Sequence, residues 1–379
     1  MPRFWNAVSR FLSPGRSIGE STFASGGRLR MEEVELNRRD ARVKDCAGAA
    51  RRTTGLDMRR MKLVKVREVI SIASILLGTA CLSQAAQLST DARSAVPREV
   101  QQLIVIDYRA MQNSTAAMEL RNRVMPPELK QLQDALEKSG LNDNHDVDQL
   151  AFALFRSSKD SDTLETLGIA QGQFPMADIL ASFRKQSIKP TKVRNNSIYP
   201  LTKAGMVLCF VDSSTIVFGD KGAVTSALDA RDGMAQNLLS NGTMMSAMQS
   251  VDSEPLWSTL DAKGTETMMR QLLGEAGSVT DFDSVKQRLQ SSWYSMNFQH
   301  GVKFDLTIST GDTFTAATIS SLMSAAMMVR KMSSTDAEKQ ALNATTIGSD
   351  SGRLSVHFAA SDSEFGSLLQ SPLFQSVVR

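Results

Sequence analysis

Along this chain of 379 residues, segments with the apolar pattern of a strand take turns with segments that have the apolar pattern of a helix. The first pattern is that of β-strands, and the continuous apolar run LIVIDY at 103–108 is typical of a strand in the centre of a sheet. Two later segments alternate apolar and polar residues, which predicts a hairpin that turns at Gln299-His300-Gly301. The further segments expected to form strands are 150–155, 166–174, a strand near Ile198, 206–211, 214–219, 255–261, 294–298, 302–308 and 354–358.

The second pattern is helical, with apolar residues three and four positions apart. The longest such segment runs from about Asp312 to Lys331. The residues expected on its buried stripe are Ile319, Leu322, Ala326 and Val329. Two capping boxes predict the starts of two short helices. They are Thr335 with Glu338 and Ser361 with Glu364, and the other expected helices are 113–123, a helix opened by Pro126-Pro127 and ended by Gly140, one from Pro175, 223–230, 265–273 and one capped by Asp281.

Short turns connect most of the expected strands, which favours antiparallel pairing. The fold class is therefore α+β: mostly antiparallel sheets with helices packed on one face. A short sequence echo, in which a strand is followed by Asp and then by Lys-Gly at the start of a helix, occurs at Asp220 and again at Asp261. This echo indicates two related α+β halves, 86–233 and 244–379, on either side of a Gly- and Asn-rich stretch.

Residues 61–85 have the three parts of a secretory signal peptide. Basic residues follow Met61, an apolar core extends from Val69 to Leu77, and a small-residue site ends at Ala85. At about 15 Å as a helix, this core is too short to span a hydrocarbon layer of about 30 Å. We expect cleavage after Ala85 and a location in the periplasm or cell envelope. Lipidation of Cys81 is the alternative, although Leu77 lies one position too far from it for a typical lipoprotein box.

Residues 1–60 differ from the rest of the chain in charge, with 13 Lys+Arg against 7 Asp+Glu. They have no persistent apolar period, so we expect them to be disordered. In one interpretation translation starts at Met61 (or Met58) and this Arg-rich leader is not part of the protein. In the other, the leader is a targeting arm or a nucleic-acid tail. The first is favoured, because a complete export signal follows the leader and no aromatic residues separate its Arg clusters.

Known catalytic and metal-binding templates are missing from the sequence, which lacks G-x-S-x-G, H-E-x-x-H, P-loop and C-x-x-C motifs. His145, His300 and His357 are each expected at the surface rather than in a catalytic role. A loop at 142–148 has oxygen ligands on alternate residues, but it lacks the Gly and the Glu of a calcium loop. Gly168 and Gly172 lie inside a strand, which favours close packing over a phosphate site. We therefore expect no enzyme activity, no cofactor and no metal.

Charge and cysteine content describe the exported part further. Residues 86–379 carry 27 basic and 32 acidic residues, so no basic surface for nucleic acid is expected. Their one cysteine, Cys209, lies in the apolar run MVLCFV and is expected to be buried. The membrane is expected to matter only through the signal peptide or a lipid anchor.

The 20 methionines are the remaining compositional signal. Methionine replaces leucine in ordinary cores, and it also lines adaptable grooves. Core packing is the favoured interpretation. If a groove is present, its apolar ligand stripe is expected to include Met323, Met327 and Met268.

Three segments resemble a family of exported proteins of environmental bacteria to which no activity is assigned. They are EVQQLIVIDYRAMQNS (99–114), LGIAQGQFP (167–175) and IVFGDKGAVTSALDARDG (216–233). The resemblance covers about residues 95–379 and implies an envelope location without catalytic residues. The resulting hypothesis is a non-catalytic binding or interaction protein whose partner is an envelope protein. The alternative is a carrier of an apolar, lipid-like ligand held between Met-bearing helices and the sheet.

Overall fold

The computed structural model describes residues 87–124, 133–134, 137–138, 146–156, 163–202, 205–273 and 282–371, all of which belong to one compact unit. Ala85, Cys81, Met61 and the Arg-rich leader lie outside these ranges. So do His145, Asp281 and the segment from Pro126 to Leu132.

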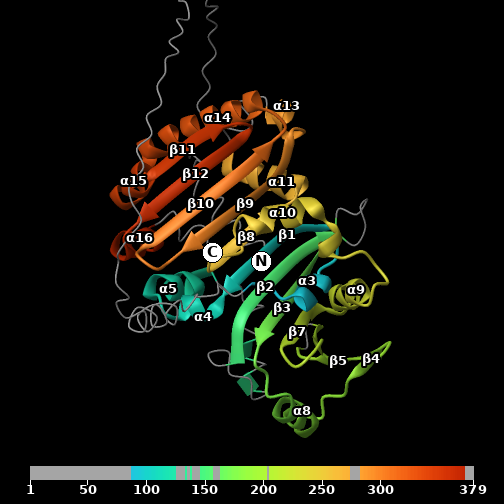
Figure 1. Ribbon diagram of the computed structural model, residues 1–379. Helices are drawn as coiled ribbons and strands as arrows, with labels where there is room; N and C mark the ends of the chain where they lie inside the picture. The colour runs from blue at the N-terminus through green and yellow to red at the C-terminus, as the bar shows by residue number, and fades with distance from the viewer. Residues whose placement is uncertain are drawn as a thin grey trace, which may run out of the picture. The chain divides into compact units, whose positions relative to one another are not determined.

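Twelve strands form one antiparallel sheet, which confirms the α+β class (Figure 1). The strand order is β11-β12-β10-β9-β8-β1-β2-β3-β7-β6-β5-β4. The strands are β1 (Val100–Asp107), β2 (Val147–Arg156), β3 (Leu164–Gly172), β4 (Thr191–Val193), β5 (Asn196–Pro200), β6 (Met206–Phe210), β7 (Thr215–Asp220), β8 (Leu256–Leu260), β9 (Leu289–Asn297), β10 (Val302–Thr310), β11 (Thr345–Asp350) and β12 (Arg353–Ala360).

Helices connect these strands and cover the sheet. They are α3 (Thr90–Ser94), α4 (Tyr108–Gln112), α5 (Thr115–Val124), α8 (Met176–Lys185), α9 (Lys221–Arg231), the 3₁₀ turn η1 (Leu238–Ser240), α10 (Gly242–Gln249), α11 (Ala262–Leu273), α13 (Phe282–Lys286), α14 (Thr313–Ser333), α15 (Asp336–Asn343) and α16 (Asp362–Leu369). Both expected capping boxes are present, at the starts of α15 and α16. The turn glycine Gly301 has a φ of 83°, as the hairpin prediction requires.

The two halves repeat one order of elements across the β1–β8 pair. The first half runs from β1 to α9 and the second from β8 to α16. In sheet order, β1-β2-β3-β7-β6 corresponds to β8-β9-β10-β12-β11, with a helix after the first, third and last strand of each series in the chain. The echo seen in the sequence does not lie at equivalent places, because Asp220 follows the last strand of the first half, whereas Asp261 follows the first strand of the second half.

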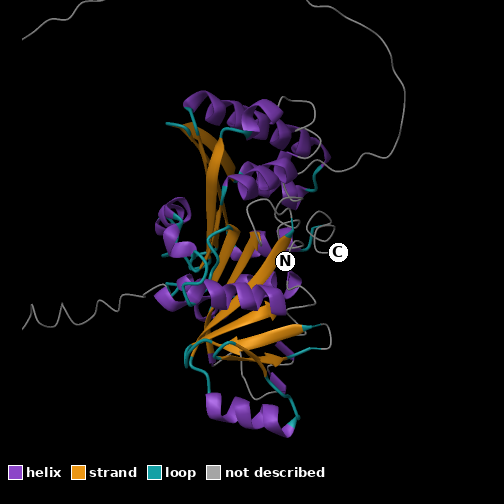
Figure 2. Ribbon diagram, turned by 90° about the vertical axis from the view of Figure 1, so that its right-hand side faces the viewer, coloured by secondary structure: helices purple, strands orange, loops and turns teal. Residues whose placement is uncertain are grey.

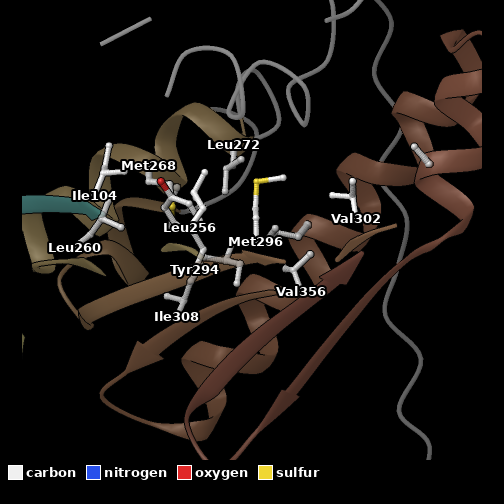
Figure 3. Packing of buried hydrophobic residues seen from close by; sticks show 14 of the residues in the cluster. Ile104, Leu256, Leu260, Met268, Leu272, Tyr294, Met296, Val302, Ile308 and Val356 are labelled. Carbon is white, nitrogen blue, oxygen red and sulfur yellow. The ribbon is translucent and has the colours of Figure 1, made fainter. Parts of the chain in front are cut away.

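Alternate residues of each strand separate two faces of the sheet. Face 1 carries Ile104 of β1 and face 2 carries Val105. On face 1, α8 covers the first half, while α11, α14 and α16 cover the second half. Figure 3 shows Met268 and Leu272 of α11 beside Leu256 and Tyr294 of this core.

Face 2 is treated differently in the two halves. In the first half, α9 and α3 pack on it through Val224 and Ala92. In the second half, α10 reaches β8 and β9, whereas the polar residues of β10, β12 and β11 on this face are largely exposed. Figure 2 shows the described helices on only one side of those outer strands. The predicted one-sided arrangement therefore describes the outer strands β10, β12 and β11 of the second half, and the first half adds helices on its second face.

Candidate functional site

Among the described residues, helix α14 has the largest number of exposed large apolar side chains. It begins after Asp312, whose carboxylate accepts hydrogen bonds from the Thr315 N–H at 2.8 Å and from the Thr315 hydroxyl at 2.9 Å. These hydrogen bonds hold the pKa of the Asp312 carboxyl below its ordinary value. The bond from the Thr315 N–H has the largest effect, and Arg288 adds to it. The helix lies along the edge strand β11 and packs on β10, β11 and β12 (Figure 1).

The inward side of α14 is a regular core stripe. Its buried residues are Thr315, Ala316, Ile319, Met323, Ala326 and Arg330. The expectation that Val329 belongs to the buried stripe is wrong, since Val329 is 57% exposed. Arg330 takes the inward position at that end of the helix, and its neighbour Val329 is turned about 100° away from it.

The outward side of α14 lacks the charges that a solvated helix face normally has. Its exposed residues three and four positions apart are Phe314, Ala317, Ser321, Ala325, Met328 and Met332, which we call the outer stripe. Phe314, Met328 and Met332 are 76%, 68% and 86% exposed. No Asp, Glu, Lys or Arg occurs from Thr313 to Val329. This exposed apolar surface makes the outer stripe the candidate contact site.

A small cavity lies beneath α14, in the place where the apolar ligand stripe was expected. Met323, Met327 and Arg330 of α14 line it together with residues of α11, α15, β11 and β12. Its volume of about 20 Å³ is room for about one water molecule. Met268 is 2% exposed in the same core but does not line the cavity. The ligand stripe therefore remains a prediction.

Arg330 is the charged residue at this cavity. Only 7% of it is exposed, and Glu338, which is 5% exposed, lies close enough to interact with it electrostatically. Burial lowers the pKa of the Arg330 guanidinium, and the Glu338 carboxylate opposes that change. Glu338 also accepts a hydrogen bond from the Thr335 N–H at 3.0 Å, within the capping box of α15. These contacts explain why Arg330 is buried: it helps to hold α14 against the start of α15.

The histidines that the structure describes are at the surface, as expected. His300 is exposed on its hairpin tip, and His357 is exposed on face 2, where its Nδ1 pairs with the Asp305 carboxylate of the adjacent strand. Within the described residues no group of three or more His, Cys, Asp or Glu side chains is placed to hold a metal ion. Cys209 is fully buried, and this burial raises the pKa of its thiol.

The predicted tight packing of the strand glycines is confirmed. A Cβ atom on Gly168 would lie 2.1 Å from the ring of Phe218, its neighbour on β7. A Cβ atom on Gly172 would lie 1.8 Å from the carbonyl oxygen of Asp146. Both glycines therefore allow close packing within the sheet and its adjoining loop.

The sequence carried a signal for the outer stripe that period analysis alone did not use. Helical periodicity identifies the buried side of a helix, and in 312–331 it indicates the core side of α14. The complementary observation is that seventeen consecutive residues, 313–329, contain no charge. Among the described helices, none has both the length and the apolar character that a membrane span requires.

Comparisons with known proteins give a limited result. No family model matches the sequence, and no curated protein matches it. Among solved structures, crystal form I of TP0453 is 13% identical, with a TM-score of 0.43, over 77% of this chain and 99% of that chain. Crystal form III of TP0453 is 12% identical, with a TM-score of 0.39, over 74% and 98% of the two chains. This chain is thus similar to TP0453 at low identity, and no residue role is transferred from it.

Proposed function

We propose that this protein is an exported, non-catalytic interaction protein of the bacterial envelope, and that the outer stripe of α14 is its contact surface for another folded protein. The observation that carries this proposal is the charge-free outer stripe. Its three large side chains are each more than two-thirds exposed, on a helix whose other side is firmly packed in the core. Removing large apolar side chains from water lowers the free energy, so a partner that covers them is bound favourably.

Methionine oxidation tests the contact surface directly. In dilute purified protein, peroxide should oxidise Met328, Met332 and Met234, which are all strongly exposed, at similar rates. In intact envelope of the cells that make the protein, Met328 and Met332 should become protected. Met234 is the internal control, because it lies in the turn after α9 and not on α14. Equal oxidation of all three methionines in the envelope would contradict the proposal.

Export is a separate part of the proposal and has its own test. The support for it is the basic, apolar and small-residue order of 61–85. Peptide mapping of the protein from its own cells should find an N-terminus at Ala86, or an acylated Cys81. A mature chain that retains residues 61–85, or one recovered from the cytosol, would contradict this part.

An apolar-ligand carrier is the second candidate, favoured by the cavity that Met323 and Met327 line. Because this cavity has room for about one water molecule, α14 would have to move away from the sheet to admit an acyl chain. Native mass spectrometry of protein purified from its own envelope measures this directly. A bare mass would contradict the carrier and leave the interaction protein unaffected.

A further inference from the structure

The outer stripe has an internal symmetry that points to one kind of partner. Counted from Ser321, a small residue lies four positions away on each side, namely Ala317 and Ala325. A large residue lies seven positions away on each side, namely Phe314 and Met328. At 3.6 residues per turn, all five lie within about 40° of one direction on the helix. The structure shows all five exposed.

A two-fold axis through Ser321 would make this pattern complementary to itself. In an antiparallel pair of α14 helices, Ala317 would face Ala325 of the second copy, and Phe314 would face Met328 of the second copy. Isologous contacts have this form, in which one patch meets the same patch. The small residues fall where the two helices cross, which lets the backbones approach closely, and the large residues fill the space on either side.

We propose that the partner of the outer stripe is a second copy of this chain, held in a two-fold antiparallel α14 pair. This inference rests on the proposed function and names its partner. Charge supports the antiparallel direction. The basic residues of the helix, Arg330 and Lys331, are in its last turn, and Asp312 is at its start. Antiparallel pairing places the positive N-terminal end of one α14 helix dipole beside the negative C-terminal end of the other.

The charges facing this contact do not favour an anionic lipid surface. Interfacial helices carry many Lys and Arg residues around an apolar stripe. The flanks of the stripe on α14 carry Ser and Thr residues with Leu322 and Val329, and none of these is charged; Arg330 is buried, and Lys331 is the remaining base. At the N-terminal end, the hydroxyl and N–H of Thr315 and the guanidinium of Arg288 surround an acidic Asp312.

The size of the stripe sets the expected strength of the dimer. A helix of 21 residues is about 31 Å long and about 10 Å wide. A contact of these dimensions lies at or below the lower end, about 1,200 Å², of interfaces that hold stable complexes. The dimer is therefore weak and reversible, and it forms at high local concentration.

Sedimentation equilibrium of the full chain tests the dimer, over a range from about 1 µM to about 1 mM. The expected result is a reversible monomer–dimer equilibrium that Met328→Glu weakens about tenfold or more, since two carboxylates then face Phe314 side chains. Met234→Glu is the matched control and should leave the equilibrium unchanged. Because Met328 is exposed and Glu favours helices, the variant should fold. A monomer at every concentration, or a dimer that Met328→Glu leaves intact, would overturn the proposal.

Cysteine cross-linking tests the register. Ser321→Cys should form a disulfide between two copies under mild oxidation, because the axis brings the two positions together. Ala317→Cys mixed with Ala325→Cys should cross-link faster than either variant alone. Peptide mass mapping identifies these bonds apart from any at Cys46, Cys81 or Cys209. Equal rates for the mixed and single variants would overturn the two-fold arrangement.

These results separate the two proposals. A monomeric chain whose Met328 and Met332 are nevertheless protected in the envelope would refute the second copy and retain an interaction protein with a different partner. A monomeric chain whose stripe is unprotected would refute both. Binding of the chain to phosphatidylglycerol vesicles that Met328→Glu abolishes, without dimerisation, would replace the second copy by a lipid surface.

Discussion

The two halves of the sheet repeat one order of elements but bury different amounts of it. On face 2 of the first half, Ile169 of β3 is fully buried between Ala151 and Val217 of the adjacent strands. At the corresponding strand of the second half, Thr307 of β10 lies between Trp293 and Ser355 and is partly exposed. The same topology thus supports a sheet with two buried faces and a sheet with one.

The last helix of each half accounts for much of this difference. Helix α9 packs on face 2 through Val224 and Leu228, whereas α16 packs on face 1 through Phe365 and Leu368. In the second half the last helix lies on face 1, so face 2 of the outer strands is not covered. Those strands are polar on face 2, because exposed apolar strand surfaces promote aggregation. The exchange also adds a helix next to α15 and α5 on face 1.

A charge placed on face 2 should separate the halves most strongly. Ile169→Lys buries an ammonium group under α9, and we expect it to destabilise the fold by about 4 kcal/mol or more. Thr307→Lys, at the equivalent strand, should change the free energy of unfolding by no more than about 0.5 kcal/mol. Urea unfolding of both variants measures the difference. Similar costs at the two sites would mean that face 2 of the first half is accessible to water.

Glycine substitutions should show a smaller contrast, between a packed position on face 1 of the first half and an open position on face 2 of the second half. Gly168→Ala places a Cβ atom 2.1 Å from the buried Phe218 ring, so the ring must shift. We expect a cost of about 2 kcal/mol from this overpacking. Gly348→Ala is the control in β11, where the nearest atom, the Ser355 Oγ, would be 3.5 Å away. It should be neutral or stabilise by up to about 0.5 kcal/mol. Thermal unfolding of the two variants measures both effects, and a neutral Gly168→Ala would show that Phe218 is loosely held.

The junction of the halves has its own ion pair. Arg156 of β2 donates to Asp261, at the start of α11, at 2.6 Å and to Gln101 of β1 at 2.8 Å, and the ion-paired side chains are 14% and 21% exposed. Arg156→Met should cost about 2 kcal/mol, because it leaves a partly buried carboxylate with fewer partners. Lys339→Met removes an exposed ion pair at 3.9 Å and should cost about 0.5 kcal/mol or less.

The measurement for this junction is urea unfolding, followed by two probes, one that reports on each half. If Arg156 couples the halves, Arg156→Met should lower the midpoint for both halves together. If instead the two halves of the variant unfold at separate midpoints, the pair is needed for their cooperativity. A variant as stable as the unmodified chain would show that the junction does not depend on this pair.

Much of this architecture could be predicted from local patterns. The continuous apolar run of β1 indicated a central strand, and the alternation in β9, β10 and β12 indicated strands with one buried face. Capping boxes located α15 and α16 because two hydrogen bonds per box depend on two nearby residues. These features depend on contacts between neighbours in sequence, which a single sequence contains.

The rest depends on contacts between distant residues. The position of β7 beside β3, with β4, β5 and β6 beyond it, follows from pairing across more than forty residues that periodicity does not show. The face on which α9 packs is likewise decided by the sheet and not by α9 itself. The exposure of Val329 is not predictable from local pattern, because the buried stripe includes Arg330, a residue whose type is normally exposed.

The smallest expected effect concerns acid sensitivity at the start of α14. Hydrogen bonds from Thr315 and the charge of Arg288 lower the folded-state pKa of Asp312 from its ordinary 3.8. Its contribution to stability is therefore complete above about pH 4 and is lost as the pH falls through the lower folded-state value. The equivalent helix of the first half, α8, begins at Pro175 without a side-chain capping bond, so it has no counterpart to this group.

Asp312→Asn isolates this contribution, because asparagine also caps helices but does not titrate. The variant should resemble the unmodified chain near neutral pH and lose less stability below about pH 4, as measured by urea midpoints along a pH series. Glu364, whose pKa the backbone N–H and hydroxyl of Ser361 lower, is the second acid of this kind in the same half. Adding Glu364→Gln should flatten the acid limb further. Parallel loss of stability in all three proteins would place the acid sensitivity elsewhere and remove this difference between the halves.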